Sequence, residues 1–315
     1  MNELSTSILR PLILRLAALP LFRWLTTETR PGRALAGRFV AGEGLPDAIA
    51  AARRLDRLRI ASMLDLLGEN ARTPERAVVA REAYVAALAT IANERTLDCA
   101  ISVKLTQLGL DESVDVCRAN LLPILEAAER DGILVMVDME SHEYADATLA
   151  VVRHAHERFP KVGVALQSYL RRSERDVFDL PPGLRIRLVK GSYLEPSEVV
   201  FEDKREVDAS FARLFVTLLA RGHAIDVATH DPRLIEGARR RVDAVDGGWS
   251  RVEFQMLYGV RRDLQTRLAQ QGYPIRVYIP YGTDWYPYLT RRLAERPANV
   301  WFFLSNLVRG GRDRS

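Results

Sequence analysis

Cysteine is almost absent from this sequence of 315 residues. The two cysteines, Cys99 and Cys117, form no CxxC pair and have no histidine beside them, which argues against a disulfide scaffold and a zinc site. We therefore expect two buried thiols that behave as small apolar side chains, no bound metal, and a reducing, cytoplasmic environment.

The sequence also lacks a long uncharged apolar run. Residues 8–25 are apolar but contain Arg10, Arg15 and Arg23, whereas a membrane span needs about 20 mostly uncharged residues. No secretory cleavage site follows the first residues either. The segment is expected either to pack on the domain as a helix or to contact a membrane or a partner subunit, and the sequence leaves both open.

Charge of one sign is never concentrated. The net charge is +4, yet the longest basic run is three arginines at residues 239–241, with no aromatic residue among them. This pattern is typical of a solvated helix face. It predicts no nucleic-acid partner, despite the basic balance.

No GxGxxG motif is present, which disfavours an open, doubly wound dinucleotide-binding sheet. Instead, short β-rich apolar runs alternate with longer helical patterns from about residue 55 onward. The predicted strands are residues 60–67, 100–105, 133–139, 162–167, 186–189, 224–229, 252–257 and 275–279. The predicted helices are residues 74–93, 114–130, 143–158, 174–179, 207–221, 232–242, 262–271 and 286–295.

Such alternation indicates parallel strands joined by right-handed crossovers. Eight units in about 250 residues predict an α/β fold of the TIM type, a (β/α)8 barrel. We assign the barrel to residues 41–315 and an N-terminal helical arm to residues 1–40.

Polar residues stand at or near the carboxyl ends of the predicted strands, where barrel enzymes place their active sites. Asp138 follows the apolar run 134–137, and Ile186 and Leu188 flank Arg187. A polar side chain in such a run is costly without a partner. The residues at these ends are Lys104, Asp138, Gln167, Arg187, Lys190, Thr229, His230, Asp231, Glu253, Gln255 and Tyr278.

Among the residues considered for ligand binding, which include those of the last predicted helix, positive charges outnumber negative ones. The cations are Lys104, Arg187, Lys190, Arg291 and Arg292, against Asp138 and Glu295. This excess favours a carboxylate or phosphate ligand, and arginine is suited to two-pronged carboxylate binding. Glu295 is four residues after Arg291, on the same helical face, where it can pair with that arginine.

Each residue alone has a simpler interpretation. Lys104 can extend from a strand end into solvent, and Asp138 can cap the next helix. The two arginines can belong to a solvated face, and His230 is more readily structural than a metal ligand. Only their shared position at one end of successive strands indicates a site.

The sequence resembles the proline dehydrogenase family along nearly the whole barrel. The matching segments are SVKL at 102–105, VDME at 137–140, LQSY at 166–169, RIRLVKGSY at 185–193, ATHD at 228–231, EFQMLYG at 253–259, VYIPYG at 277–282 and YLTRRLAE at 288–295. Each is weak alone, but their order and spacing are specific. The compact chain is similar to the monofunctional bacterial members.

The resemblance implies FAD as cofactor and oxidation of L-proline to Δ1-pyrroline-5-carboxylate by hydride transfer from C5 to flavin N5. Arg187 would lie beside N5, and Met139 and Gln167 would line the flavin. The remaining cofactor contacts would come from Lys190, Gly191, Ser192, Thr229 and His230.

For the substrate, the resemblance implies a carboxylate clamp of Lys104, Arg291 and Arg292. Asp138, Tyr193 and Tyr278 would shape the proline pocket, with Asp138 also counted as catalytic, and Glu295 would brace the arginines. It further implies a quinone electron acceptor and a cytoplasmic protein that touches the inner membrane peripherally.

Two rival functions stay open at this point. One is another flavin barrel enzyme, similar to methylenetetrahydrofolate reductase. The other is a non-redox barrel that binds a phosphorylated metabolite or nucleic acid, which the basic balance allows. The sequence also leaves open whether the chain forms a homo-oligomer, whether hydroxyproline is accepted, and whether the active site closes over its substrate.

Overall fold

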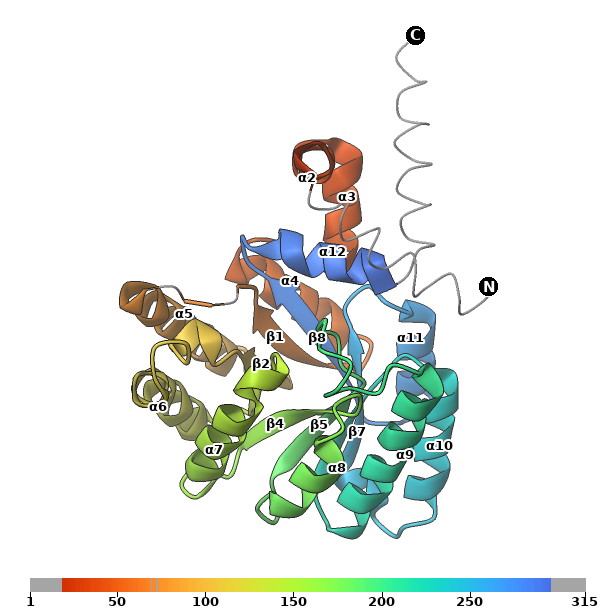
Figure 1. Cartoon of the computed structure of the whole chain (residues 1–315). Helices are drawn as coiled ribbons and strands as arrows, with labels where there is room; N and C mark the ends of the chain where they lie inside the picture. Colours follow the sequence, from red (N-terminus) through yellow and green to blue (C-terminus); the bar gives the residue numbers. More distant parts are fainter. Residues whose placement is uncertain (1–18, 69, 72, 296–315) are drawn as a thin grey trace.

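A closed barrel of eight parallel strands forms the centre of the molecule in the computed structural model, which describes residues 19–295 apart from 69 and 72 (Figure 1). The strands follow one another around the barrel in chain order, and β8 pairs with β1 to close it. They are β1 (Ala61–Leu66), β2 (Cys99–Val103), β3 (Val135–Val137), β4 (Val162–Gln167), β5 (Arg185–Val189), β6 (Ala224–Ala228), β7 (Val252–Leu257) and β8 (Ile275–Tyr281). The predicted (β/α)8 barrel is confirmed.

Helices surround the strands and connect them. They are α2 (Pro20–Thr27), α3 (Arg30–Phe39), α4 (Leu45–Asp56), α5 (Pro74–Asn93), α6 (Val114–Asp131), α7 (Ala145–His156), α8 (Ser173–Asp176), α9 (Lys204–Ala220), α10 (Pro232–Asp243), α11 (Arg262–Gln270) and α12 (Trp285–Glu295). Short 3-10 turns lie at Thr106–Leu108, His142–Tyr144, Val177–Asp179 and Gly248–Ser250. None of the helices within the described residues is long and apolar enough to span a bilayer.

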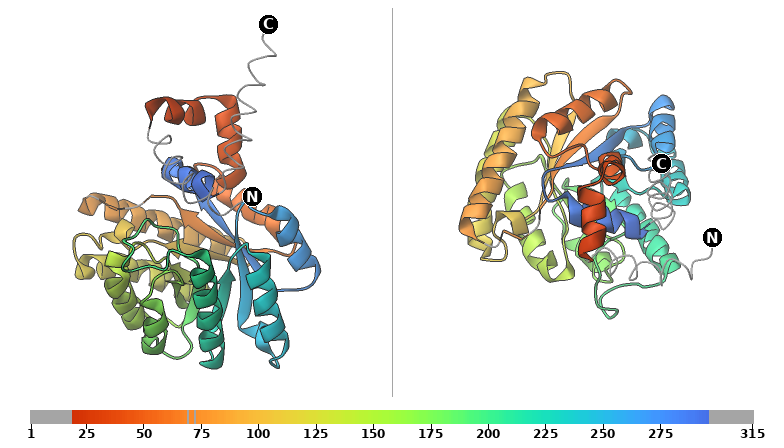
Figure 2. Two further views of the ribbon diagram at one scale, coloured as in Figure 1. Left: turned by 45° about the vertical axis from the view of Figure 1, so that its right-hand side comes forward. Right: turned by 90° about the horizontal axis from the view of Figure 1, so that it is seen from above.

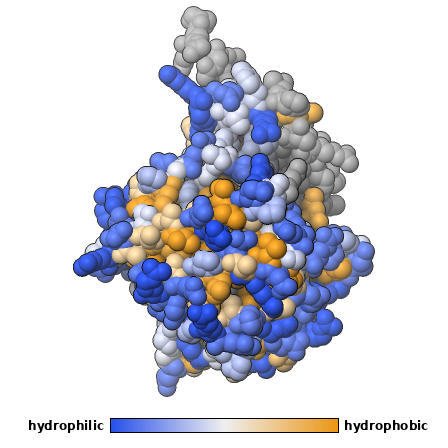
Figure 3. All heavy atoms as spheres, turned by 90° about the vertical axis from the view of Figure 1, so that its left-hand side faces the viewer, coloured by the Kyte–Doolittle hydropathy of each residue, from blue (hydrophilic) through white to orange (hydrophobic). Residues whose placement is uncertain are grey.

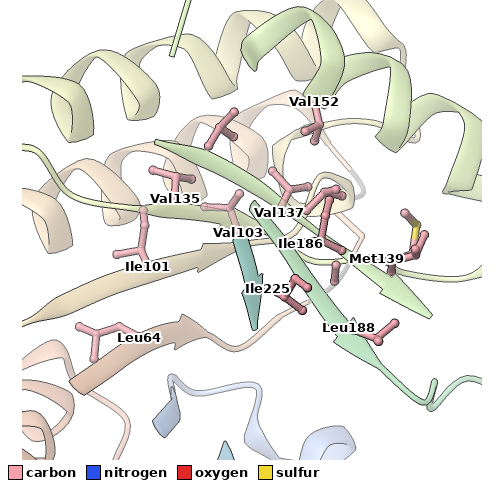
Figure 4. Packing of buried hydrophobic residues seen from close by; sticks show 14 of the residues in the cluster. Leu64, Ile101, Val103, Val135, Val137, Met139, Val152, Ile186, Leu188 and Ile225 are labelled. Carbon is pink, nitrogen blue, oxygen red and sulfur yellow. The ribbon is translucent and has the colours of Figure 1, made fainter. Parts of the chain in front are cut away.

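The two faces of each strand carry different side chains. Apolar residues such as Val137, Ile186 and Ile225 pack between the sheet and the surrounding helices, as Figure 4 shows. Burying each such side chain stabilises the fold by about 1.5–3 kcal/mol. Because side chains alternate along a strand, the residues between them point into the barrel, and these include Arg187 and Asp226.

Helix α4 was not predicted, and it decides where the last helix lies. It packs against β1 and β8, burying Ala48, Ala51 and Ala52 completely. Helix α4 therefore occupies the outer side of β8, where the helix after β8 would pack in a regular barrel. Instead, α12 crosses over the middle of the molecule when it is viewed from above (Figure 2, right). The helix that carries Arg291 and Arg292 therefore lies over the barrel mouth.

Helix α3, from the predicted arm, packs on α12. Leu35 and Phe39 of α3 form one buried cluster with Leu289 and Leu293 of α12. Helix α3 also approaches the loop after β7, which requires Gly259, since a Cβ there would lie 1.7 Å from the Arg38 carbonyl oxygen. The predicted boundary at residue 40 remains a prediction, and residues 1–18 of the arm lie outside the described residues.

The outer surface carries scattered apolar groups. The face shown in Figure 3 has hydrophobic patches interrupted by hydrophilic residues. Single exposed apolar side chains, such as Val79 and Leu122, are normal on a globular protein. The two cysteines are buried as predicted, and burial raises the pKa of both thiols to about 12.

Candidate active site

The carboxyl end of β2 places Lys104 inside the barrel mouth. Its ammonium nitrogen lies 2.5 Å from Asp65 Oδ1 on β1 and 3.1 Å from Asp138 Oδ2, which follows β3. The Tyr278 hydroxyl of β8 lies 3.4 Å from the same nitrogen and donates a 2.7 Å hydrogen bond to Asp138. Lys104 is only 5% exposed, so it does not extend into solvent. Asp138 likewise binds side chains of the barrel interior instead of capping the next helix.

Arg187 of β5 completes this cluster. Its Nη1 donates to Asp138 Oδ1 at 2.6 Å and to Ser102 Oγ at 3.2 Å, while Nε donates to Gln255 Oε1 at 2.8 Å. The guanidinium also lies over the Tyr278 ring, 5.0 Å from its centroid. Side chains of β2, β7 and β8, together with Asp138 after β3, thus fix the position of one buried arginine.

The ionisation of Asp138 follows from these neighbours. Burial would raise the pKa of its carboxyl, but the nearby Lys104 and Arg187 outweigh burial and lower that pKa to about 2. Burial would lower the pKa of Lys104, yet Asp65 reverses the effect, and the pKa lies well above its ordinary value. Asp138 is therefore ionised and too weak a base to take a proton near neutral pH, and its carboxylate pairs with both cations.

A second set of charges continues inside the barrel. Arg276 of β8 donates to Glu253 of β7 at 2.8 Å, and Arg185 of β5 pairs with Asp226 of β6. Buried charges are costly unless they are paired and hydrogen-bonded, which these are. Burial, with the neighbouring Glu253, raises the pKa of Asp226 to about 6.

Gln167 lies at the end of β4 beside Met139. Its Nε2 donates to the Met139 carbonyl oxygen at 2.9 Å. Its Oε1 is buried and has no hydrogen-bond partner among the residues described. Buried polar atoms in native proteins are almost always paired, so this oxygen fits an N–H group of a bound molecule.

The segment after β5 contains the next predicted residues. Lys190 Nζ lies 2.5 Å from Asp208 and 3.1 Å from Asp231. Gly191 has φ +116°, and a Cβ there would lie 2.1 Å from a ring carbon of Tyr169. Only glycine allows the backbone to follow this path, which leads directly to Ser192 and then Tyr193.

Thr229 and His230 form the turn after β6. Thr229 is buried, and its Oγ1 accepts a 3.2 Å hydrogen bond from the backbone N–H of Asp231. His230 Nε2 accepts a 3.0 Å hydrogen bond from the backbone N–H of Leu257. The histidine thus ties the ends of β6 and β7 together, in agreement with the structural interpretation.

Helix α12 brings Arg291 to Tyr193, in the segment after β5, whereas Arg292 lies over Tyr288 of α12 itself. The Arg291 guanidinium carbon lies 5.9 Å from the Tyr193 ring centroid, and that of Arg292 lies 5.3 Å from the Tyr288 ring centroid. The backbone of Glu295 ends α12, but its side chain lies outside what the structure describes, so the predicted bracing role remains untested.

The balance of charge at the mouth differs from the one predicted. Lys104 is neutralised by Asp65 as well as Asp138, and Lys190 has two carboxylate partners on α9 and in the turn after β6. Asp65 was missed, although it interrupts the apolar run Ala61–Leu66 just as Asp138 ends its own. The excess of positive charge is therefore smaller at the lysines than the sequence predicts.

Comparison with known proteins agrees with this architecture. The sequence matches the Proline dehydrogenase family over residues 48–304. It is 42% identical over 284 residues to "Proline dehydrogenase" of Deinococcus radiodurans and 40% identical over 277 residues to "Proline dehydrogenase 1" of Bacillus subtilis. These alignments cover 88% and 87% of this chain and 91% of each relative.

A solved structure shares the fold. Proline utilization A from Bdellovibrio bacteriovorus superposes with a TM-score of 0.76 at 24% identity, over 83% of this chain. The chain spans about a third of that longer protein, 32% of its length, and the likeness concerns the fold alone. The family match and the two relatives carry the assignment. The sequence-based prediction is therefore confirmed: this chain is an enzyme of the proline dehydrogenase family.

Proposed function

We propose that this protein oxidises L-proline to Δ1-pyrroline-5-carboxylate, with FAD as its resident cofactor, in the first step of proline catabolism. The observation that carries the proposal is the buried cluster of Lys104, Asp138, Arg187 and Tyr278 at the barrel mouth, beneath a helix with two arginines. Because the chain belongs to the proline dehydrogenase family, we assign this cluster to the oxidation of proline.

The residues on one side of the mouth fit a flavin nucleotide. Gln167 offers an unpaired buried acceptor, and Gly191 lets the backbone after β5 lie against the Tyr169 ring, where a Cβ would clash. Met139, Lys190, Ser192, Thr229 and His230 would supply the remaining contacts. FAD, when bound, supplies the acceptor for a hydride from C5 of proline.

The other side of the mouth suits an amino acid. Arg291 and Arg292 would bind the carboxylate of proline, since guanidinium groups match it with two parallel hydrogen bonds. Lys104 would add positive charge from below. Tyr193 and Tyr278 would enclose the ring, and Glu295 would brace the arginines. Holding the substrate in one orientation lowers the barrier by several kcal/mol.

The charges of the cluster favour the reaction electrostatically. Arg187, held by Asp138, would stabilise negative charge that develops next to it without having to reorganise. The ring nitrogen of proline must give up its proton before C5 can lose a hydride. Neighbouring cations favour the neutral amine by like-charge repulsion. Asp138 orients this machinery and does not act as a general base.

A backbone substitution tests the cofactor assignment. Gly191→Ala is expected to weaken FAD binding at least tenfold, because the new Cβ meets Tyr169 and φ is strained by about 1–3 kcal/mol. The matched control is Gly183→Ala, at φ +79° with nothing within 4 Å of the added Cβ. FAD content after dialysis measures both. Full FAD retention by Gly191→Ala would remove this segment from the cofactor site.

The electron acceptor is the second part of the proposal. We infer that electrons pass to a quinone, and that the cytoplasmic protein meets the inner membrane peripherally to reach it. With L-proline and a soluble ubiquinone analogue, the purified protein is expected to reduce one quinone per product formed. Product formation with an artificial dye but none with the quinone would leave the substrate in place and refute the quinone as acceptor.

A further inference from the structure

Asp226 is a buried carboxylate to which the reaction as described gives no role. It stands on β6, opposite Arg187 of β5 and Glu253 of β7 in the strand register. It is fully buried, with Arg185 as its ion-pair partner. Its second carboxylate oxygen, Oδ2, accepts a 2.7 Å hydrogen bond from Gln255 Nε2.

Gln255 connects this carboxylate to Arg187. Its Nε2 donates to Asp226 at 2.7 Å and to Glu253 Oε1 at 2.8 Å, so both amide hydrogens are used. An ionised carboxylate can only accept hydrogen bonds. The amide nitrogen must therefore face the two acids, and the amide oxygen is turned toward Arg187 Nε, 2.8 Å away.

The two acids are not equivalent in this arrangement. Glu253 is bound mainly by Arg276, which approaches both of its oxygens at 2.8 and 3.3 Å. Asp226 has Arg185 on one oxygen and Gln255 on the other. Asp226, on the strand beside that of Arg187, therefore binds the Gln255 amide whose oxygen accepts from Arg187.

The orientation matters because the Gln255 oxygen is the acceptor for Nε of Arg187, 2.8 Å away. Nη1 binds Asp138 at 2.6 Å and Ser102 at 3.2 Å, and Nη2 contacts the Met63 sulfur, so these residues hold the other edges of the guanidinium. If the amide flipped, its NH2 group would face the Nε–H group, and two donors would meet. Arg187 would then lose its hydrogen bond at Nε.

We propose that Asp226 is a positioning residue, which fixes the Gln255 amide so that Arg187 is held for reaction. The inference rests on the proposed function, in which Arg187 lies beside the reacting centre. Asp226 touches neither substrate nor cofactor in this account and acts through two side chains.

Asp226→Asn is the first variant to measure, with proline-dependent flavin reduction followed by anaerobic stopped flow. Asparagine replaces one of the two carboxylate oxygens with an NH2 group, so either Arg185 or Gln255 then faces a donor instead of an acceptor. The limiting reduction rate is expected to fall about tenfold, a typical scale for one misplaced charged hydrogen bond. The apparent Kd for proline should change less than threefold, because the carboxylate clamp is intact.

A double-mutant cycle separates positioning from stability. Gln255→Met removes the amide that Asp226 orients, so Asp226→Asn should lower the reduction rate less than twofold further in that background. A further tenfold loss in the double variant would overturn the proposal, because Asp226 would then act without Gln255. If Asp226→Asn does not fold, the pH dependence of the wild-type rate still decides.

The midpoint potential and the pH dependence of the rate distinguish positioning from stability, because a purely structural role of Asp226 would change neither. The two-electron midpoint potential of Asp226→Asn should fall by about 30 mV, which equals a tenfold weaker stabilisation of the reduced cofactor. The wild-type reduction rate should also decline as pH falls through about 6, since protonation of Asp226 mimics the variant, and Asp226→Asn should lack this limb. The charged groups facing Asp226 are Arg185 and Arg187 on β5, Glu253 on β7 and Arg276 on β8.

The control is Asp176→Asn, another buried aspartate that pairs with an arginine, Arg172 at 2.6 Å, on α8 outside the barrel. It should lower stability without changing the rate or the potential. An Asp226→Asn rate and potential equal to wild type would overturn the inference while leaving the function intact. Wild-type protein that is not reduced by proline would refute the proposed function, and the inference with it.

Discussion

Exchanging Asp138 for asparagine is expected to lower kcat/KM for L-proline at least 100-fold, a loss of about 2.7 kcal/mol. Asp138 is bound by Lys104, Arg187 and Tyr278 at once. A neutral amide does not balance the charge of Lys104 or Arg187. Its NH2 group would also replace one carboxylate oxygen and face hydrogen-bond donors of these side chains. Removing one partner of a buried ion pair costs about 3–5 kcal/mol, so both the site and the fold should suffer.

Steady-state kinetics and FAD content would measure this effect. Asp146→Asn is the control, because Asp146 also pairs with an arginine but is 86% exposed and lies outside the mouth. Its activity should stay within twofold of wild type. An Asp138→Asn enzyme with wild-type kcat/KM would show that this carboxylate does not organise the site.

Stability should depend on pH in a way that reports the same carboxylate. The pKa of Asp138 is about 2 in the folded state against an ordinary value of 3.8. A depressed carboxyl pKa stabilises the folded state above the ordinary value, and this contribution is lost as pH falls through the folded value. The difference in unfolding free energy between wild type and Asp138→Asn should therefore be constant above about pH 5 and shrink toward pH 2.

Arg292→Lys is expected to raise KM for L-proline by about 10- to 100-fold while FAD stays bound. Lysine keeps the charge but cannot form two parallel hydrogen bonds with a carboxylate, and it stacks less well on a ring such as Tyr288. kcat should change less than KM, because the substrate, once bound, still meets the same cluster.

Arg240→Lys is the matched control, since Arg240 is 71% exposed on α10 and away from the mouth. Its KM should equal that of wild type. If KM for proline is unchanged in Arg292→Lys, this arginine does not belong to the carboxylate clamp.

The fold could be predicted closely from sequence because strand and helix periods alternate without ambiguity. Helix α5 was predicted at its observed bounds, and most strands were placed within one or two residues. The place of α12 could not be predicted. A helical period does not say whether a helix packs beside a barrel or over its mouth. Here the choice depends on α4, which packs against β1 and β8 and follows no strand within the described residues.

The site could be predicted only in part. Lys104, Asp138, Arg187 and Tyr278 were identified because strand ends of a barrel converge, and they do meet. Two further carboxylates were missed: Asp65, which pairs with Lys104, and Asp226, which binds Arg185 and Gln255. Asp65 and Asp226 carry the same signal, one acid in an apolar strand, but which inward side chains meet depends on the stagger of the strands, and no local pattern gives that.

The central claim is that this protein carries FAD and reduces it with L-proline. Its most direct test is the absorbance spectrum of the purified protein under anaerobic conditions, before and after L-proline is added. We predict a flavin spectrum that bleaches on addition of L-proline. A flavin that stays oxidised would contradict the substrate, and a protein that takes up no flavin even when FAD is supplied would contradict the account as a whole.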